Sequence, residues 1–210
     1  MLVTKRSGKT EEFAADKINR RAQLACEGYQ GVFGPLSNVA ASEIIMKAQM
    51  DIYPGIPTKE LDQALINSAR TRIQFEPNYS FAAARLLMFT LYEEVMGPSE
   101  SDFWFENYAS SFKASLQDAV TRELANPELL NFDLDKLAAA LQPSRDYIIH
   151  YLGIQTLYDR YFLHTPAPEK RRLETPQAFF MRVAMGLALK EENREERAIE
   201  FYNKLSSFDM

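Results

Sequence analysis

The chain of 210 residues is long enough to form one large or two small domains, each with a hydrophobic core. Hydrophobic residues make up 46% of it and charged residues 25%, which excludes disorder over most of its length. The net charge of -5 at pH 7 argues against a nucleic-acid-binding protein, because such proteins present a strongly basic surface.

The first part of the chain predicts a β-hairpin followed by four helices. Ser7-Gly8 is a turn signal between two short extended segments, and stretches rich in glycine and proline separate the helices that follow. Asp16 and Thr58 carry side chains suited to capping the first and third helices. The expected elements are strands at 2–6 and 10–13 and helices at 16–27, 38–51, 58–75 and 79–96.

Gly97-Pro98-Ser99 predicts a domain boundary, so we expect one domain over residues 1–96 and a second over residues 97–210. The second domain is predicted to be helical as well. Thr175-Pro176 is a strong helix start, because a capping hydroxyl precedes a proline at the first helical position. Further helical segments are expected at 103–124, from 133, from 143 and at 194–206, with mixed structure at 147–162 and a polar loop at 167–171.

Cys26 is the only cysteine of the sequence, which excludes an intrachain disulfide and a thiolate zinc cluster. It shares one helical face with Ile18, Ala22 and Ala25. That spacing favours a buried small hydrophobic residue over a reactive thiol.

The sequence predicts a cytoplasmic protein without metal ligands. Charged residues appear within the first six positions, before an apolar run long enough for a secretory signal. Arg85 and Arg182 interrupt the longest apolar stretches, so neither stretch could cross a bilayer. His150 and His164 lack the spacing of a metal site, and we assign no metal.

The first hairpin raises the question of phosphate binding. Gly8-Lys9-Thr10 lacks the earlier glycine of a P-loop, because Val3 stands at that position, and no buried strand precedes it. Lys5, Arg6 and Lys17 nevertheless place positive charge close to the start of a helix, where anions are favoured. The alternative is a solvated hairpin beside a capped helix, and residue chemistry alone favours that alternative.

The opening residues, LVTKRSG at 2–8 followed by Glu11 and by DKI at 16–18, resemble the start of an ATP-cone. Thr58 and AARL at 83–86 fit the same pattern. The resemblance implies a β-hairpin capping a four-helix bundle that binds ATP or dATP as an allosteric effector. By position, it implies a nucleotide site lined by Val3, Lys5, Arg6, Glu11, Lys17, Ile18 and Thr58. The three basic residues would meet the phosphates, while Glu11 and Ile18 would face the base.

Three positions depart from the pattern of this family. Ala14 stands where the family often has asparagine, and Thr90 and Glu93 stand where active cones often have a histidine and then a lysine. A glutamate repels phosphate instead of binding it. Weak or absent nucleotide binding, and loss of shut-off by dATP, are therefore open alternatives.

Two segments of the second half closely resemble the all-helical N-terminal domain of class I ribonucleotide reductase large subunits. They read YLGIQTLYDRY at 151–161 and LETPQAFFMRVAMG at 173–186, and residues 201–208 fit the end of that domain. Taken without the resemblance, both are ordinary packed segments. The resemblance implies a mainly α fold, with an ATP-cone followed by an all-helical domain and without the catalytic ten-stranded barrel that comes next in the family.

The chemistry of that family needs a cysteine thiyl radical and a redox-active cysteine pair, whereas this sequence holds Cys26 alone. We therefore expect a chain that is not catalytic by itself and that contributes regulatory and scaffold domains to a ribonucleoside-diphosphate reductase. The implied partners are a polypeptide carrying the barrel and a radical-bearing small subunit, in a dimeric holoenzyme without nucleic acid or membrane. A stand-alone ATP- or dATP-sensing module, a purely structural module and a truncated reading frame are the alternatives.

Overall fold

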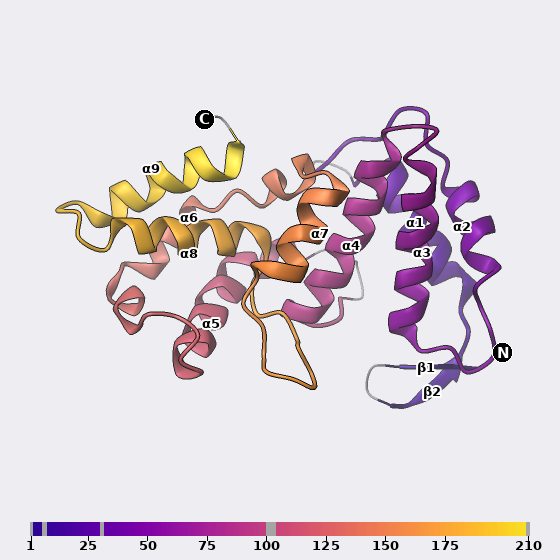
Figure 1. Cartoon of the computed structure of the whole chain (residues 1–210), viewed down its shortest axis with the longest axis horizontal. Coiled ribbons are helices and arrows are strands. Elements are labelled where there is room, and N and C mark those ends of the chain that lie inside the picture. Colours follow the sequence, from indigo (N-terminus) through magenta and orange to yellow (C-terminus); the bar gives the residue numbers. More distant parts are fainter. Residues whose placement is uncertain (1, 6–7, 30–31, 100–103, 209–210) are drawn as a thin grey trace. The chain divides into compact units, whose positions relative to one another are not determined.

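The computed structural model describes residues 2–5, 8–29, 32–99 and 104–208, and the chain divides into two compact units. The first unit comprises residues 1–90 and 147–155, and the second comprises residues 91–146 and 156–210. The described residues form nine α-helices and one two-stranded sheet (Figure 1). The predicted mainly α fold with an N-terminal β-hairpin is therefore confirmed. The predicted boundary between residues 96 and 97 stays a prediction.

The hairpin of the first unit is shorter than its sequence pattern indicates. Strands β1 (Leu2–Thr4) and β2 (Thr10–Glu12) pair antiparallel, with Val3 opposite Glu11. Successive side chains of a strand point to opposite faces, and Val3 is the buried one of its strand. Part of the predicted first strand and turn, at residues 6 and 7, lies outside the described residues.

Four helices begin in the first unit: α1 (Ala15–Glu27), α2 (Ala41–Gln49), α3 (Thr58–Arg72) and α4 (Tyr79–Met96). The buried residues of α1 are Ile18, Ala22, Ala25 and Cys26, which is the face predicted from the sequence. Its alanines, like Ala48 of α2 and Ala69 of α3, are almost fully buried. Small side chains at these positions allow helices to pack closely. The core is completed by Ile44, Ile56, Leu65, Ile66, Leu86 and Leu87.

The predicted capping residues of α1 and α3 are wrong. The residue that precedes α1 is Ala14, and Asp16 lies within the first helical turn. The residue that precedes α3 is Pro57, so Thr58 is the first helical residue and not the cap. The capping positions are thus occupied by alanine and proline. Neither side chain can accept a hydrogen bond from the free N–H groups of the first helical turn. Asp16 still favours α1 through the helix dipole.

The second unit holds the remaining helices: α5 (Tyr108–Thr121), α6 (Leu134–Ala140), α7 (Tyr151–Arg160, of which residues 156–160 belong here), α8 (Pro176–Ala188) and α9 (Arg194–Ser207). Short 3₁₀ helices lie at Phe105–Asn107, Pro127–Asn131 and Pro143–Ile148. Asp133 caps α6 by accepting a hydrogen bond from Lys136 N at 3.0 Å. Helix α8 starts at Pro176 after Thr175, as predicted, but the predicted capping hydrogen bond to the Thr175 hydroxyl is absent.

Two features of the second unit differ from the sequence pattern. The segment predicted as mixed contains a regular helix, α7, because packing of Tyr151 and Ile154 at helical spacing outweighs the low helix propensity of its aromatic residues. Helix α8 packs against α9, and its residues Met181 and Met185 are completely buried. Full burial of side chains of this size contributes about 1.5–3 kcal/mol each.

Candidate functional site

The hairpin is held against the start of α3 by hydrogen bonds. Thr4 N donates to Ile56 O at 3.0 Å, and Gly55 N donates to Leu2 O at 2.8 Å. The Thr4 hydroxyl donates to Gly55 O at 3.2 Å. Gly55 has a φ of +85°, a conformation that favours glycine. Thr4 also pairs with Pro57, so Thr58, the next residue, lies close to the end of β1.

A cluster of three charged side chains lies at the hairpin. Glu11 Oε2 lies 2.6 Å from Lys5 Nζ, and Glu11 Oε1 lies 3.5 Å from Lys17 Nζ. The side chains of Lys5, Glu11 and Lys17 are 44%, 31% and 71% exposed, so all three are open to solvent. The hydrogen bond from Lys5, together with the charge of Lys17, lowers the pKa of Glu11 from its ordinary value. Glu11 is thus a carboxylate at neutral pH.

Two predicted site residues near this cluster have apolar side chains. Val3 is opposite Glu11 in the hairpin and is 3% exposed, and Ile18 follows Lys17 in α1 and is 9% exposed. Ile18 thus offers only a small surface to a base. Arg6 is the one predicted site residue that lies outside the described residues.

Sequence reasoning missed an ion pair that joins two helices of the site. Arg21 Nη1 donates to Asp62 Oδ1 at 2.6 Å, and both side chains are largely buried. Arg21 lies one turn beyond Lys17 on α1, and Asp62 lies one turn beyond Thr58 on α3. The sequence does contain a signal for this pair. Each of its residues lies four positions after a predicted site residue, which places both on the same helix face as that residue. The pair fixes the helices that carry Lys17 and Thr58 relative to each other.

The three departures from the family pattern occupy different surroundings. Ala14 is exposed and directly precedes α1. Thr90 is buried, and its hydroxyl donates to Leu86 O at 3.3 Å within α4, so it presents no group to a ligand. Glu93 is half-buried and belongs to the second unit.

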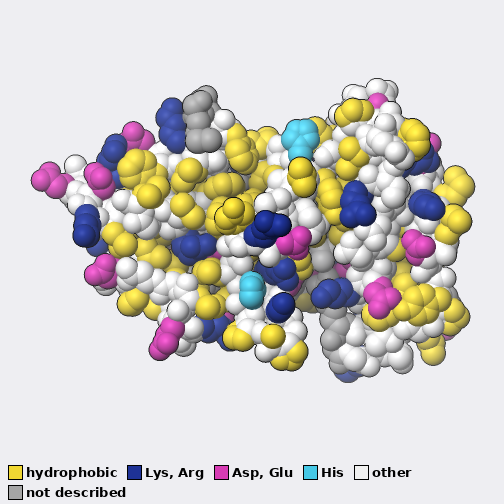
Figure 2. Space-filling model, in the orientation of Figure 1, with side chains coloured by type: hydrophobic (Ala, Val, Ile, Leu, Met, Phe, Trp, Pro, Cys, Tyr) yellow, Lys and Arg dark blue, Asp and Glu magenta, His cyan; other side chains and the backbone are white. Residues whose placement is uncertain are grey.

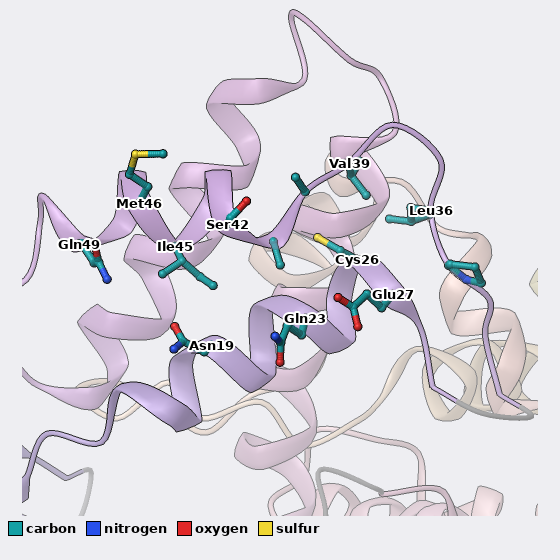
Figure 3. A pocket seen from close by; sticks show the side chains of 13 residues that line it. Asn19, Gln23, Cys26, Glu27, Leu36, Val39, Ser42, Ile45, Met46 and Gln49 are labelled. Carbon is teal, nitrogen blue, oxygen red and sulfur yellow. The ribbon is translucent and has the colours of Figure 1, made fainter.

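A pocket of about 640 Å³ opens between α1 and α2, away from the residues of the predicted nucleotide site. Figure 3 shows side chains of α1 facing those of α2 across it. Its lining is mixed, with Asn19, Gln23, Cys26 and Glu27 on α1 and Ser42, Ile45, Met46 and Gln49 on α2. None of the predicted site residues lines it, so size alone does not identify the nucleotide site.

Cys26 is buried, as predicted. Burial raises the pKa of its thiol to about 11, with a smaller opposing effect from Arg85. The thiol is therefore protonated at neutral pH. A protonated, inaccessible thiol is a poor nucleophile and a poor metal ligand.

A carboxyl group with a strongly perturbed pKa lies in the second unit. Asp146 is completely buried; its Oδ2 accepts hydrogen bonds from the hydroxyls of Tyr92 at 2.6 Å and Tyr108 at 2.8 Å. Its Oδ1 accepts from Gln177 Nε2 at 2.8 Å, and Tyr202 in turn donates to Gln177 Oε1 at 2.7 Å. Burial raises the pKa of Asp146 to about 7, although the three donors lower it. A group without solvent access cannot meet a substrate, so we regard this cluster as structural.

Within residues 2–5, 8–29, 32–99 and 104–208, no three histidine, cysteine or acidic side chains gather as metal ligands. No helix in those ranges combines the length and apolar character needed to cross a membrane.

Comparison with known proteins identifies two domains and one group of relatives. The ATP cone domain family matches residues 1–94, and the family described as "Ribonucleotide reductase, all-alpha domain" matches residues 149–210. The ribonucleoside-diphosphate reductase subunit alpha of Chlamydia muridarum is 42% identical over 208 residues, which is 98% of this chain and 19% of that protein. The subunit alpha of Helicobacter pylori is 34% identical over 211 residues, covering 100% of this chain and 25% of that protein. The large subunit of Danio rerio is 32% identical over 211 residues, covering 98% and 24%.

The chain thus spans about a fifth to a quarter of the length of the curated relatives that it matches. Both domain matches follow the order that the resemblance implied, and the hairpin cluster lies within the first of them. This chain belongs to the ribonucleotide reductase large-subunit family, of which it contains the ATP cone domain and the all-alpha domain.

Proposed function

We propose that the chain is the regulatory and scaffold part of a ribonucleoside-diphosphate reductase large subunit, and that it binds ATP or dATP at the hairpin. The observation that carries the proposal is the cluster of Lys5 and Lys17 around one face of the hairpin, within the ATP cone domain. Lys17 lies in the first turn of α1, where the N–H groups also favour anions. Lys5, Lys17 and Arg6 would bind the phosphates.

The base would bind between polar and apolar neighbours of the same cluster. Glu11 offers a carboxylate that can accept a hydrogen bond from an exocyclic amine, and Ile18 offers a small apolar edge. Thr58 begins α3 beside the end of β1, where its hydroxyl can reach a ligand. Metal ions play no part in this binding site as we propose it.

Catalysis would depend on a partner. Reduction of a ribonucleotide needs a thiyl radical and two further redox-active cysteines, and the sequence offers only the buried Cys26. We therefore propose that a polypeptide carrying the catalytic barrel and a radical-bearing small subunit assemble with this chain, in a dimeric and cytoplasmic holoenzyme. The proposal makes the chain a component of the enzyme and not an enzyme by itself.

Helix α8 offers a surface for this assembly. Figure 2 shows hydrophobic side chains gathered on the surface of the second unit, around α8 and α9. Leu187 is 61% exposed and Tyr161 is 56% exposed, and Tyr161 lies near the ring of Phe179 on α8. Exposed apolar side chains that gather in one patch commonly mark a surface that contacts another protein. We propose that this surface contacts the catalytic polypeptide.

A binding experiment tests the assembly. The part of the Chlamydia muridarum relative that does not match this chain would be expressed separately and mixed with it on gel filtration. We expect a complex with the wild type and loss of it with Leu187→Glu, since burial of a charge is costly. Leu152→Glu is the matched control, because Leu152 is a leucine outside the proposed surface that is 77% exposed, more than Leu187. Failure of the wild type to form a complex would contradict the proposed assembly.

A purely structural role is the second candidate. One observation in its favour is that Glu11 pairs with both lysines, which leaves less positive charge for a phosphate. Another is that the buried Thr90 stands where active cones often have a histidine. Titration calorimetry with ATP and dATP separates the two. A dissociation constant well below about 1 mM supports the nucleotide site, and one above it supports the structural role.

A further inference from the structure

The segment between α7 and α8 forms an arm that projects from the second unit, and we define this arm as residues 163–173. Its two sides pair like a hairpin, since Leu173 N donates to Leu163 O at 2.8 Å. Figure 1 shows the arm extending away from the helices that flank it, and every residue of its tip, at 166–170, is exposed. The tip therefore adds nothing to the hydrophobic core of the unit.

Two carboxylates fix the base of the arm. Glu174, which is 4% exposed, accepts a hydrogen bond from Leu163 N at 2.9 Å, and Glu94 of α4 accepts one from Arg172 N at 2.7 Å. The Arg172 guanidinium also donates to Tyr158 O at 3.0 and 2.8 Å, and it lies 3.7 Å from the centre of the Tyr158 ring. Both sides of the arm are thus tied to the unit. A partner would not have to order the arm, so the entropic cost of binding it is low.

The tip of the arm holds a strained lysine. Thr165 is 2% exposed, and its Oγ1 accepts from Arg171 N at 2.9 Å and donates to Glu169 Oε2 at 3.2 Å. Lys170 has a φ of +49°, a left-handed conformation that glycine adopts freely and that a residue with a Cβ adopts at a cost. Strain of this kind clusters at functional positions. A role for the Lys170 side chain outside the fold explains why a lysine stands where a glycine would be less strained.

The arm is basic, although the chain as a whole is acidic. Residues 160–172 contain four lysines or arginines and one acidic residue, whereas the whole chain contains 24 and 29. The Arg172 side chain is already bonded to the unit. The basic side chains open to a partner are Arg160 and Lys170, which are exposed, and Arg171, which is 36% exposed. Figure 2 shows Lys and Arg side chains gathered on the surface of this unit.

We propose that the arm is a docking site for an acidic segment of a partner protein, with Lys170 as its principal contact. Cations spread along a projecting tip match carboxylates spread along a peptide, whereas a phosphate site needs donors that converge on one point. A nucleic acid would extend beyond the arm over a chain of net charge -5, which opposes it. A short acidic segment covers the arm alone. Binding through exposed ion pairs is weak and falls as the salt concentration rises.

The test uses nuclear magnetic resonance on the whole, isotope-labelled chain. The probe is a glutamate homopeptide of about ten residues, compared with a glutamine homopeptide of the same length, at about 0.05 M and about 0.3 M salt. The variants are Lys170→Gly and Lys170→Arg. Lys190→Gly is the matched control, because Lys190 is an exposed lysine of the same unit outside the arm. Thermal unfolding of each variant reports on the fold.

We expect the glutamate peptide to shift amide signals of residues 164–172 saturably at low salt, and the glutamine peptide to leave them unchanged. Lys170→Gly should bind the glutamate peptide at least about threefold more weakly, since one ion pair of a few is lost. Lys170→Arg should stay within about twofold of the wild type because it keeps the charge, and so should Lys190→Gly. Lys170→Gly should not lower the midpoint of thermal unfolding, because glycine relieves the strain at this position. A purely structural lysine would not give weaker binding together with an unweakened fold.

Three results would overturn the proposal. The first is the absence of shifts with the glutamate peptide, or equal binding of it by Lys170→Gly and Lys190→Gly. The second is a lower thermal midpoint for Lys170→Gly, which would show that the lysine serves the fold. The third is tighter binding of inorganic tripolyphosphate or duplex DNA than of the glutamate peptide at the same residues, which would replace the acidic protein segment by a phosphate-bearing ligand. All three are independent of nucleotide binding at the hairpin.

Discussion

The buried carboxyl of Asp146 makes the stability of the second unit depend on pH. Its pKa is raised by burial to about 7, whereas an unfolded chain leaves it near 3.8. The folded state therefore holds its proton over a range in which the unfolded state has lost it. This contribution to stability is fully present below about pH 4 and is lost as the pH rises through about 7.

The size of the effect follows from these two pKa values. With a folded pKa of about 7, linkage gives a loss of about 3 kcal/mol between pH 5 and pH 8. That is a large fraction of the stability of an ordinary domain, which is about 5–15 kcal/mol. The lowered pKa values of Glu11, Glu195 and Glu196 act below this window and in the opposite direction.

Urea unfolding at pH 5, 6, 7 and 8 measures the dependence. Trp104 is the only tryptophan of the chain, is buried in the second unit and lies beside Tyr92, so its fluorescence reports this unit. Asp146→Asn should remove most of the dependence. Asp118→Asn, at an exposed carboxylate paired with Arg122, should keep it. A wild-type stability that is flat or rises from pH 5 to 8 would refute the reasoning.

Three further predictions concern other buried groups. Arg21→Ala should destabilise the first unit by about 1–2 kcal/mol, and a double-mutant cycle with Asp62→Ala should give a coupling of about 1 kcal/mol in chemical denaturation; additive effects would contradict the pairing. Arg182→Met should lower the free energy of unfolding by about 3 kcal/mol, because the nearly buried Glu174 loses its bidentate hydrogen bonds from Arg182, both at 2.8 Å. A loss below about 0.5 kcal/mol would show that the pair is dispensable. Cys26 should not react with a thiol reagent at pH 7 until urea unfolds the first unit, and fast labelling of the folded chain would show that the thiol is accessible.

Local signals in the sequence were sufficient for most helices. Gly97-Pro98 predicted the end of α4, and Thr175-Pro176 predicted the start of α8, because glycine and proline restrict the backbone wherever they occur. The predicted caps of α1 and α3 were wrong because local signals do not decide where these two helices begin. Ala14 and Pro57 provide no capping side chain, so those helix starts are set by the hairpin and by the segment that pairs with it.

The buried cluster around Asp146 could not be predicted. Its members Tyr92, Tyr108, Gln177 and Tyr202 come from four helices and are separated by up to 110 positions, with no spacing that marks them as neighbours. Such a group exists only after the helices have packed. The α8 surface was hidden for a related reason, since an exposed leucine such as Leu187 in a largely apolar helix looks like a core residue in a sequence.

The candidate site was predicted in part. The resemblance placed Lys5, Glu11 and Lys17 together, and the structure brings them into contact. It did not indicate that Glu11 would pair with both lysines, because the conformations of exposed side chains do not follow from a motif. The Arg21–Asp62 pair was missed, although each residue lies one helical turn from a predicted site residue.

The central claim is that the hairpin binds a nucleotide through its lysines. Calorimetry of ATP with the wild-type chain and with a Lys5→Ala/Lys17→Ala double variant tests it most directly. We predict saturable binding of about one ATP per wild-type chain, with a dissociation constant below about 1 mM, and at least about tenfold weaker binding by the double variant. No binding by the wild type at millimolar ATP, or equal binding by both proteins, would contradict the claim.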